Sequence, residues 1–126
     1  MTARRLEGLR VLVAEDELLL ALDLCDMLKE AGCEILGPAR SLAATEALAA
    51  NTQNIHIALL DLNLAGESSL DLASRLASQG TPVIITTGYD QADLPADFQS
   101  MRICVKPIAS GLLLRSMEEL LAERTN

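Results

Sequence analysis

The sequence is poor in aromatic residues: its 126 residues include no tryptophan, one phenylalanine and one tyrosine. Half of the residues are hydrophobic, so leucine, alanine, isoleucine and valine must form the core. No window approaches the roughly 18 unbroken apolar residues of a transmembrane helix. Glu7, Gly8 and Arg10 interrupt the apolar segment that a signal peptide would need. We therefore expect a soluble, cytoplasmic protein with a single domain, 1–126, and a folded core at about 9–123.

Basic residues are also scarce, with 10 against 18 acidic ones and a formal net charge of −8. A domain this acidic repels a phosphate backbone, which argues against nucleic-acid binding. Cys25, Cys33 and Cys104 are odd in number and lack CxxC spacing, so we expect them to pack as small hydrophobic residues. His56 is the only histidine and stands in no catalytic motif, so we assign it no role.

Short apolar runs alternate with helical patterns along the whole chain. The predicted strands are 9–14, 33–36, 55–60, 82–86 and 103–105, with Gly37-Pro38 ending the second. The predicted helices are 17–31, 41–50, one from Ser68 or Ser69 to about Gly80, and a last one with the apolar stripe Leu113, Leu114, Met117, Leu120 and Leu121. Pro95 interrupts residues 88–100, so the fourth helix should be short or disordered. After the last helix we expect no output domain.

This alternation predicts an α/β fold, a doubly wound parallel sheet with helices on both faces. In such sheets ligands bind beyond the carboxyl ends of the strands. Polar residues stand at those predicted ends: Glu15-Asp16, Asp61 with Asn63, Thr87, and Lys106-Pro107. Residues that are far apart in the sequence should therefore meet in one crevice.

The predicted crevice has the side chains of a cation and phosphoryl site. Three carboxylates in one place repel one another, which raises their pKa values unless a cation joins them. Mg²⁺, or Mn²⁺, suits a site of few carboxylates, and the backbone carbonyl of Asn63 could add a ligand. Asp61 is the best candidate nucleophile, while Thr87 and Lys106 are donors for phosphoryl oxygens.

Each of these motifs has a simpler interpretation when it is taken alone. An acidic pair after a strand can be the start of a helix, where the dipole favours negative charge. Asp61 can be a turn residue, and Lys-Pro is a common dipeptide. Pro107 predicts a tight turn that aims Lys106 inward, with a cis peptide bond as one option. The combination, in this order and at strand ends, favours a functional site.

The set Glu15-Asp16, Asp61, Thr87 and Lys106-Pro107 resembles the receiver domain of bacterial two-component response regulators, from Leu9 to the last helix. The resemblance implies a CheY-like fold with strand order 2-1-3-4-5. It implies that Asp61 accepts a phosphoryl group from a sensor histidine kinase. It also implies that Asp16, Asp61 and the Asn63 carbonyl bind Mg²⁺, with Glu15 helping through water. Thr87 and Lys106 would contact the phosphoryl group.

One position departs from the family: Ile103 stands where the switch aromatic is expected, three residues before Lys106. The sequence Thr87-Gly88-Tyr89 is instead similar to the free-standing alphaproteobacterial receivers of the Thr-Gly-Tyr (FATGUY) type, which work with kinases of the HWE or a related type. We hypothesise that Tyr89 and residues 88–100 replace the missing aromatic as the output element. The alternative is that the Tyr89 ring closes the site without signalling.

These residues predict a phosphorylated signalling module that is not an enzyme beyond its own phosphoryl transfer and dephosphorylation. Partner binding, relay to a histidine phosphotransfer protein, and a phosphate sink all stay open, as a monomer or weak dimer. The expected docking surface includes Arg102, Arg115, Glu118 and Glu119. An aspartate-based phosphohydrolase is disfavoured because Asp61 follows the third strand and no cap domain fits. A receiver-like module that is never phosphorylated would typically lack an acid or the lysine.

Overall fold

The computed structural model describes residues 6–88 and 101–125, and it shows a five-stranded parallel sheet. Its strands are β1 (Arg10–Ala14), β2 (Glu34–Ala39), β3 (Ile57–Asp61), β6 (Val83–Thr87) and β7 (Arg102–Val105). Their spatial order is β2-β1-β3-β6-β7. Since these are the first to fifth sheet strands along the chain, the predicted order 2-1-3-4-5 is confirmed.

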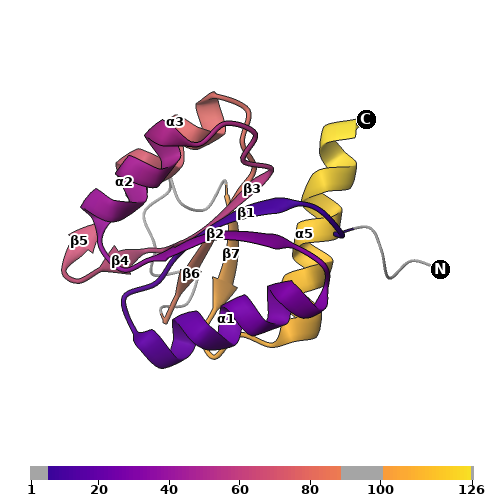
Figure 1. Cartoon of the computed structure of the whole chain (residues 1–126), viewed down its shortest axis with the longest axis horizontal. Helices are drawn as coiled ribbons and strands as arrows, with labels where there is room; N and C mark the ends of the chain where they lie inside the picture. The colour runs from indigo at the N-terminus through magenta and orange to yellow at the C-terminus, as the bar shows by residue number, and fades with distance from the viewer. Residues whose placement is uncertain (1–5, 89–100, 126) are drawn as a thin grey trace.

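Helices cover both faces of this sheet (Figure 1). The described helices are α1 (Leu18–Glu30), α2 (Leu42–Asn51), α3 (Leu70–Ser78) and α5 (Ser110–Thr125). One apolar cluster joins Leu28 of α1 and Met117 of α5 to the sheet, and the other joins Leu48 of α2 and Leu76 of α3 to it. The predicted fourth helix and Tyr89 fall outside the described residues. Within residues 6–88 and 101–125, every helix is too short or too polar to cross a membrane.

The central strand β3 connects the two halves of the core. All five of its residues are buried. Ile57 and Leu59 belong to the cluster under α1 and α5, whereas Ala58 and Leu60 belong to the cluster under α2 and α3. This alternation follows from the two-residue period of a strand that is covered on both faces. The core is aliphatic, as the composition predicts.

The second strand runs further than the sequence predicts. Gly37-Pro38 does not end β2, which continues to Ala39 and pairs there with Ala14. Two features explain the difference. Gly37 adopts a φ of 112°, which glycine tolerates and which accompanies a register shift between Leu12 and Ala14. Pro38 has no N–H to donate, but β2 is an edge strand and needs no second partner.

A short hairpin follows β3 where the sequence predicts only a loop. Its strands are β4 (Asn63–Leu64) and β5 (Glu67–Ser68), and they pair antiparallel. The two turn residues, Ala65 and Gly66, have φ angles of 52° and 92°. Positive φ at both central positions is the pattern of a type I′ turn, the usual connection in a two-residue hairpin. The hairpin lies directly after Asp61 and before α3.

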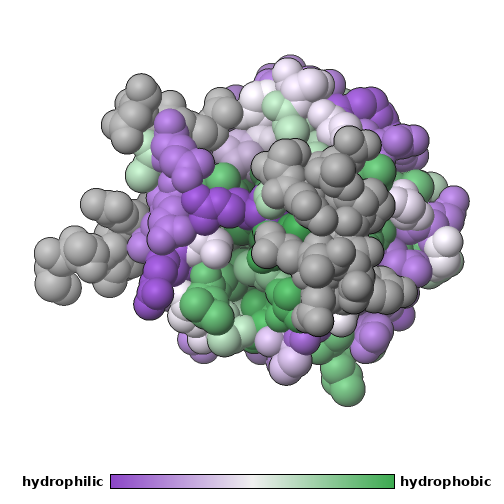
Figure 2. Space-filling model, turned by 180° about the vertical axis from the view of Figure 1, so that it is seen from behind, coloured by the Kyte–Doolittle hydropathy of each residue, from purple (hydrophilic) through white to green (hydrophobic). Residues whose placement is uncertain are grey.

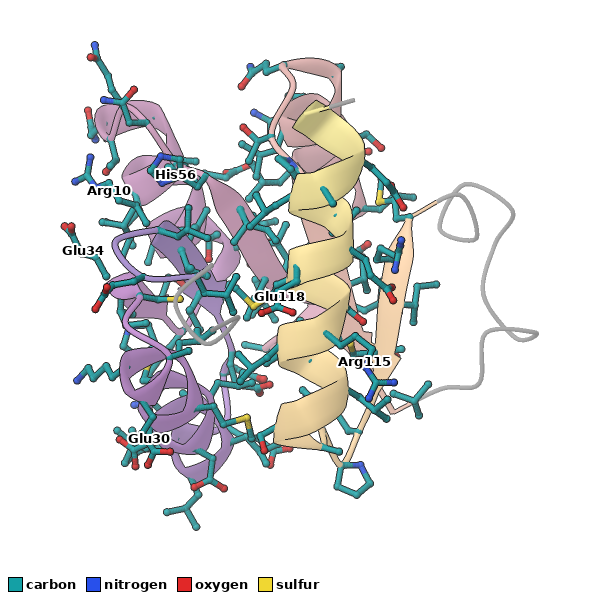
Figure 3. All side chains as sticks on the ribbon, turned by 90° about the vertical axis from the view of Figure 1, so that its right-hand side faces the viewer. Arg10, Glu30, Glu34, His56, Arg115 and Glu118 are labelled. Atoms are coloured by element: carbon teal, nitrogen blue, oxygen red, sulfur yellow. The ribbon has the colours of Figure 1, made fainter. Side chains whose placement is uncertain are left out.

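His56 lies before β3, at the amino end of the sheet (Figure 3). Its Nδ1 accepts a hydrogen bond from the backbone N–H of Arg10 at 2.9 Å. The Arg10 guanidinium in turn donates to the carbonyl of Gln53 at 2.9 Å and lies 3.5 Å from Glu34. These contacts join the start of β1 to the segment before β3, which fits a histidine without a catalytic role.

Candidate functional site

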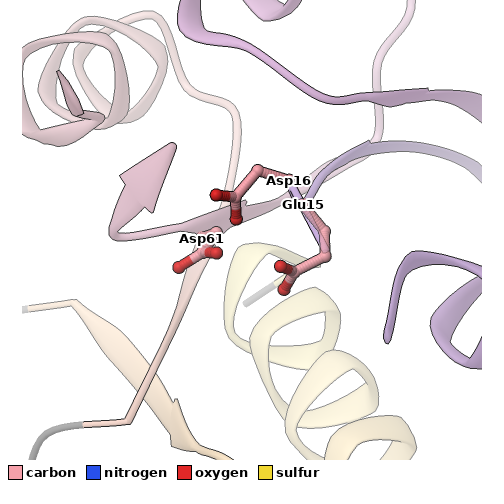
Figure 4. A group of neighbouring side chains, drawn as sticks. All are labelled: Glu15, Asp16 and Asp61. Carbon is pink, nitrogen blue, oxygen red and sulfur yellow. The ribbon is translucent and has the colours of Figure 1, made fainter. Parts of the chain in front are cut away.

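Three carboxylates converge at the carboxyl end of the sheet (Figure 4). Glu15 and Asp16 directly follow β1, and Asp61 is the last residue of the neighbouring strand β3. One oxygen from each carboxylate lies within 4.8 Å of the others. Glu15 is fully buried, Asp61 is 5% exposed, and Asp16 is half-buried. The residues that the sequence places at separate strand ends therefore form one cluster.

Lys106 provides the positive charge of this cluster. Its Nζ lies 2.9 Å from Oε1 of Glu15 and donates a hydrogen bond to Oδ2 of Asp61 at 3.1 Å. The residue directly follows β7, and its backbone N–H donates to the carbonyl of Thr87 at 2.7 Å. The Lys106-Pro107 peptide bond is cis, the option raised from the sequence. Three carboxylates and one ammonium leave two net negative charges when all are ionised.

The pKa values reflect this imbalance. Burial raises the pKa of Asp61 from 3.8 to about 7, the Lys106 hydrogen bond opposes this, and the nearby Glu15 adds to it. Burial alone would lower the pKa of Lys106, but its bonds to Glu15 and Asp61 raise it. For Asp16, burial is outweighed by hydrogen bonds, first that from the Ala65 N–H, and its pKa lies below 3.8. Asp16 is thus charged at neutral pH, whereas Asp61 is only about half ionised there, and a further positive charge would complete its ionisation.

The donor set fits a hard divalent cation. All three candidate ligands are carboxylates, which suit Mg²⁺ or Mn²⁺, and the single ammonium does not neutralise them. Both oxygens of Glu15 are already engaged, one by Lys106 and the other by the backbone N–H of Glu17 at 3.0 Å. Both oxygens of Asp61 are also engaged, by Lys106 and by the Asn63 N–H, so Asp16, the most exposed of the three acids, is the most available ligand.

The other predicted residues surround this acidic cluster. Thr87 is buried at the end of β6, one residue beyond Thr86, which pairs with Asp61. Asn63 donates its backbone N–H to Oδ1 of Asp61 at 3.3 Å. Ile103 is half-buried in β7 opposite Ile85 and packs against the cluster under α2 and α3. It is part of the core on that side of the sheet.

Ser69 is a site residue that the sequence did not reveal. It is fully buried, and its hydroxyl donates to the backbone carbonyl of Asp61 at 2.8 Å. Its backbone N–H donates to the carbonyl of Leu62 at 3.0 Å. The sequence marks this serine only as a candidate start of a helix. In the structure its side chain makes no capping bond to α3 and instead holds the backbone of Asp61.

The chain belongs to the family of response regulator receiver domains, whose sequence pattern matches residues 11–118. It is 34% identical over 113 residues to the transcriptional regulatory protein PdtaR of Mycobacterium tuberculosis, covering 86% of this chain and 55% of that protein. The chain thus spans about half the length of the curated relatives it matches. The resemblance seen in the sequence is confirmed.

Solved structures agree with this assignment. The receiver domain of Erythrobacter litoralis PhyR matches with a TM-score of 0.79 and 26% identity over 92% of each chain. The BeF3-activated conformation of SdrG from Pseudomonas melonis Fr1 matches with a TM-score of 0.76 and 27% identity, over 89% of this chain and 95% of SdrG. The fold is therefore the CheY-like fold that the sequence predicts.

Proposed function

We propose that this receiver domain accepts a phosphoryl group on Asp61 from the phosphohistidine of a sensor histidine kinase, and that the reaction depends on a divalent cation. The observation that carries the proposal is the surroundings of Asp61. Its carboxylate is buried at a strand end, bonded to Lys106, and within 4.8 Å of two further carboxylates that can share a cation with it. The match to receiver domains supports the same assignment.

In this reaction an Asp61 oxygen forms a bond to phosphorus, the phosphorus–nitrogen bond of phosphohistidine breaks, and the imidazole leaves with that electron pair. Lys106 can transfer one hydrogen bond from Asp61 to a phosphoryl oxygen while it keeps Glu15. A bound Mg²⁺ would neutralise charge that develops on the phosphoryl oxygens. Thr87 provides a hydroxyl at the neighbouring strand end. We propose no catalysis beyond this transfer and the later hydrolysis of the acyl phosphate.

We further propose that the phosphorylated domain signals by contacting another protein at β7 and α5. A groove of about 330 Å³ lies there, lined by Ile103, Val105, Ile108 and Leu112 among others. Val105 and Leu112 are 42% and 61% exposed. Figure 2 shows apolar side chains on this side of the molecule, next to the hydrophilic outer surface of α5. An HWE-type kinase and a histidine phosphotransfer protein are the partner classes that this surface should be tested with.

The charged residues expected to form the docking surface do not act alike. Arg102 forms ion pairs with Glu119 and Glu123 on α5, so its charge is already balanced. Arg115 and Glu118 are three residues apart and so lie on neighbouring parts of the α5 surface, with Glu118 on the side nearer α1 (Figure 3). Any partner at the β7–α5 groove would therefore depend more on the apolar residues than on this charged set.

Labelling with acetyl phosphate tests the proposed function. The purified chain should gain one phosphoryl group in the presence of Mg²⁺, as measured by intact mass, and EDTA should prevent the gain. Asp61→Asn should not be labelled. Asp71→Asn is the matched control because Asp71 is an exposed acid in the first turn of α3. Equal labelling of Asp61→Asn and the wild type would disprove the assignment of Asp61.

A further inference from the structure

The hairpin after β3 is bonded to the acidic cluster through its backbone. The N–H of Ala65 donates to Oδ2 of Asp16 at 3.1 Å, although the two residues lie 49 positions apart. The N–H of Asn63 donates to Oδ1 of Asp61 at 3.3 Å. The N–H of Gly66 donates to the side-chain oxygen of Asn63 at 2.7 Å. Two of these bonds connect the hairpin to Asp16 and Asp61, and the third lies within the hairpin.

Ala65 adopts a backbone conformation that its side chain does not favour. Its φ of 52° lies in the left-handed region, which L-residues other than glycine rarely adopt because of the clash of Cβ with the backbone. Type I′ turns usually place asparagine, aspartate or glycine at this first position. The alanine methyl is exposed to solvent, so it adds no burial that could offset the cost. The hydrogen bond to Asp16 is the contact that this conformation provides.

This bond matters for a cation because it fixes Oδ2 of Asp16, and so the orientation of the carboxylate, within the acidic cluster. Asp16 is only half-buried, and without a partner its carboxylate could rotate toward solvent. Carboxylate ligands of metals are commonly oriented by hydrogen bonds from groups that do not touch the metal. Removal of such partners typically weakens metal binding about 10- to 100-fold.

We propose that Ala65 is a positioning residue: its backbone N–H, presented by the left-handed turn of the β4–β5 hairpin, orients the Asp16 carboxylate for the divalent cation. The inference rests on the cation site of the proposed function. It assigns the role to a backbone group, so side-chain substitutions that preserve the turn leave the role intact. The geometry of the hairpin, and not the identity of residue 65, sets the affinity of the site.

The test replaces the Leu64–Ala65 amide with an ester, by incorporating lactic acid at position 65 through nonsense suppression. This change removes the N–H and keeps the methyl group. Ala65→Gly is the matched control because glycine keeps the N–H and tolerates the positive φ. The dissociation constant for Mg²⁺ is measured by calorimetric titration for the wild type, the ester variant and Ala65→Gly. We expect the ester to bind Mg²⁺ about 10- to 100-fold more weakly and Ala65→Gly to bind within about twofold of the wild type.

An ester variant that folds and binds Mg²⁺ as tightly as the wild type would overturn the inference and leave the proposed function standing. Failure of the wild type itself to bind Mg²⁺ would overturn both. Thermal unfolding in EDTA checks that each variant is folded. Should the ester variant not fold, amide hydrogen exchange in Asp16→Ala decides the question: the Ala65 amide should exchange at least about tenfold faster, with the Gly66 amide unchanged. Unaltered Ala65 exchange would contradict the inference.

Discussion

At the scale of single residues, one ammonium is shared by two buried carboxylates. Lys106 contacts both Glu15 and Asp61, and a third acid lies beside them. Such a cluster is stable only when a proton or a cation joins it. The raised pKa of Asp61 is the sign of this shortage of positive charge, and a bound cation would relieve it. Because the three carboxylates outnumber the one ammonium, the site favours the binding of a cation.

Replacing Asp61 should therefore stabilise the cation-free protein in a pH-dependent way. Its pKa is about 7 in the folded chain and near 3.8 in the unfolded one, so between these values the folded state holds a proton that the unfolded state has released. The free energy of unfolding thus falls as the pH rises through this window. An asparagine amide does not ionise, so Asp61→Asn should be more stable by about 4 kcal/mol near pH 7.5 and about equally stable near pH 4.

Urea unfolding in EDTA at both pH values measures this difference. Groups far from Asp61 titrate alike in both proteins, so their contributions cancel in the comparison. Added Mg²⁺ should shrink the advantage of the variant, because the cation binds the wild-type carboxylate. A difference between the two proteins that is the same near pH 4 and pH 7.5 would contradict the raised pKa.

At the scale of elements, the structure departs from the sequence prediction at an edge strand and at a turn. Most strands and helices begin and end within two residues of the sequence prediction, because apolar periodicity and burial agree there. The exceptions are β2, which passes through Gly37-Pro38, and the β4–β5 hairpin. Both depend on backbone conformations with positive φ, which a pattern of apolar residues does not report.

Alanine substitutions at two glycines distinguish the cost of an unfavourable backbone φ from the cost of a steric clash at the new Cβ. Gly37 and Gly66 both have positive φ, so alanine is strained at either. At Gly66 a Cβ would meet nothing within 4 Å, but at Gly37 it would lie 2.7 Å from the Ala39 nitrogen and 2.8 Å from the Val13 oxygen. We expect Gly66→Ala to lower the free energy of unfolding by about 1 kcal/mol and Gly37→Ala by about 3 kcal/mol or more. Urea unfolding measures both, and equal losses would show that β2 does not approach β1 so closely.

At the scale of the whole molecule, the fold brings together acids that the unfolded chain keeps apart. Asp16 and Asp61 are 45 positions apart, and they meet because β1 and β3 are neighbours in the sheet. A cation that needs both carboxylates binds the folded state far better than the unfolded one. Cation binding at this site should therefore raise the free energy of unfolding of the chain.

Mg²⁺ should stabilise the whole chain by an amount set by its concentration. At about 100 times its dissociation constant, it should add about 2.7 kcal/mol to the free energy of unfolding. Asp16→Asn removes a ligand and should abolish most of this gain, whereas Asp71→Asn, an exposed acid outside the cluster, should keep it. Thermal unfolding with Mg²⁺ and with EDTA measures the effect. Equal stabilisation of Asp16→Asn and wild type would place the cation elsewhere.

The sequence by itself determined the fold class, the strand order through the family resemblance, and the acids, threonine and lysine at the strand ends. It could do so because the carboxyl ends of parallel strands lie along one edge of the sheet, so the residue types at those ends predict which groups the site contains. The tertiary structure alone decided how Lys106 divides its contacts between Glu15 and Asp61, and that Ser69 and Ala65 hold the site. Those roles depend on backbone groups and on distances across the sheet. Every residue other than proline has both an N–H and a carbonyl, so only the folded geometry shows which of them are used.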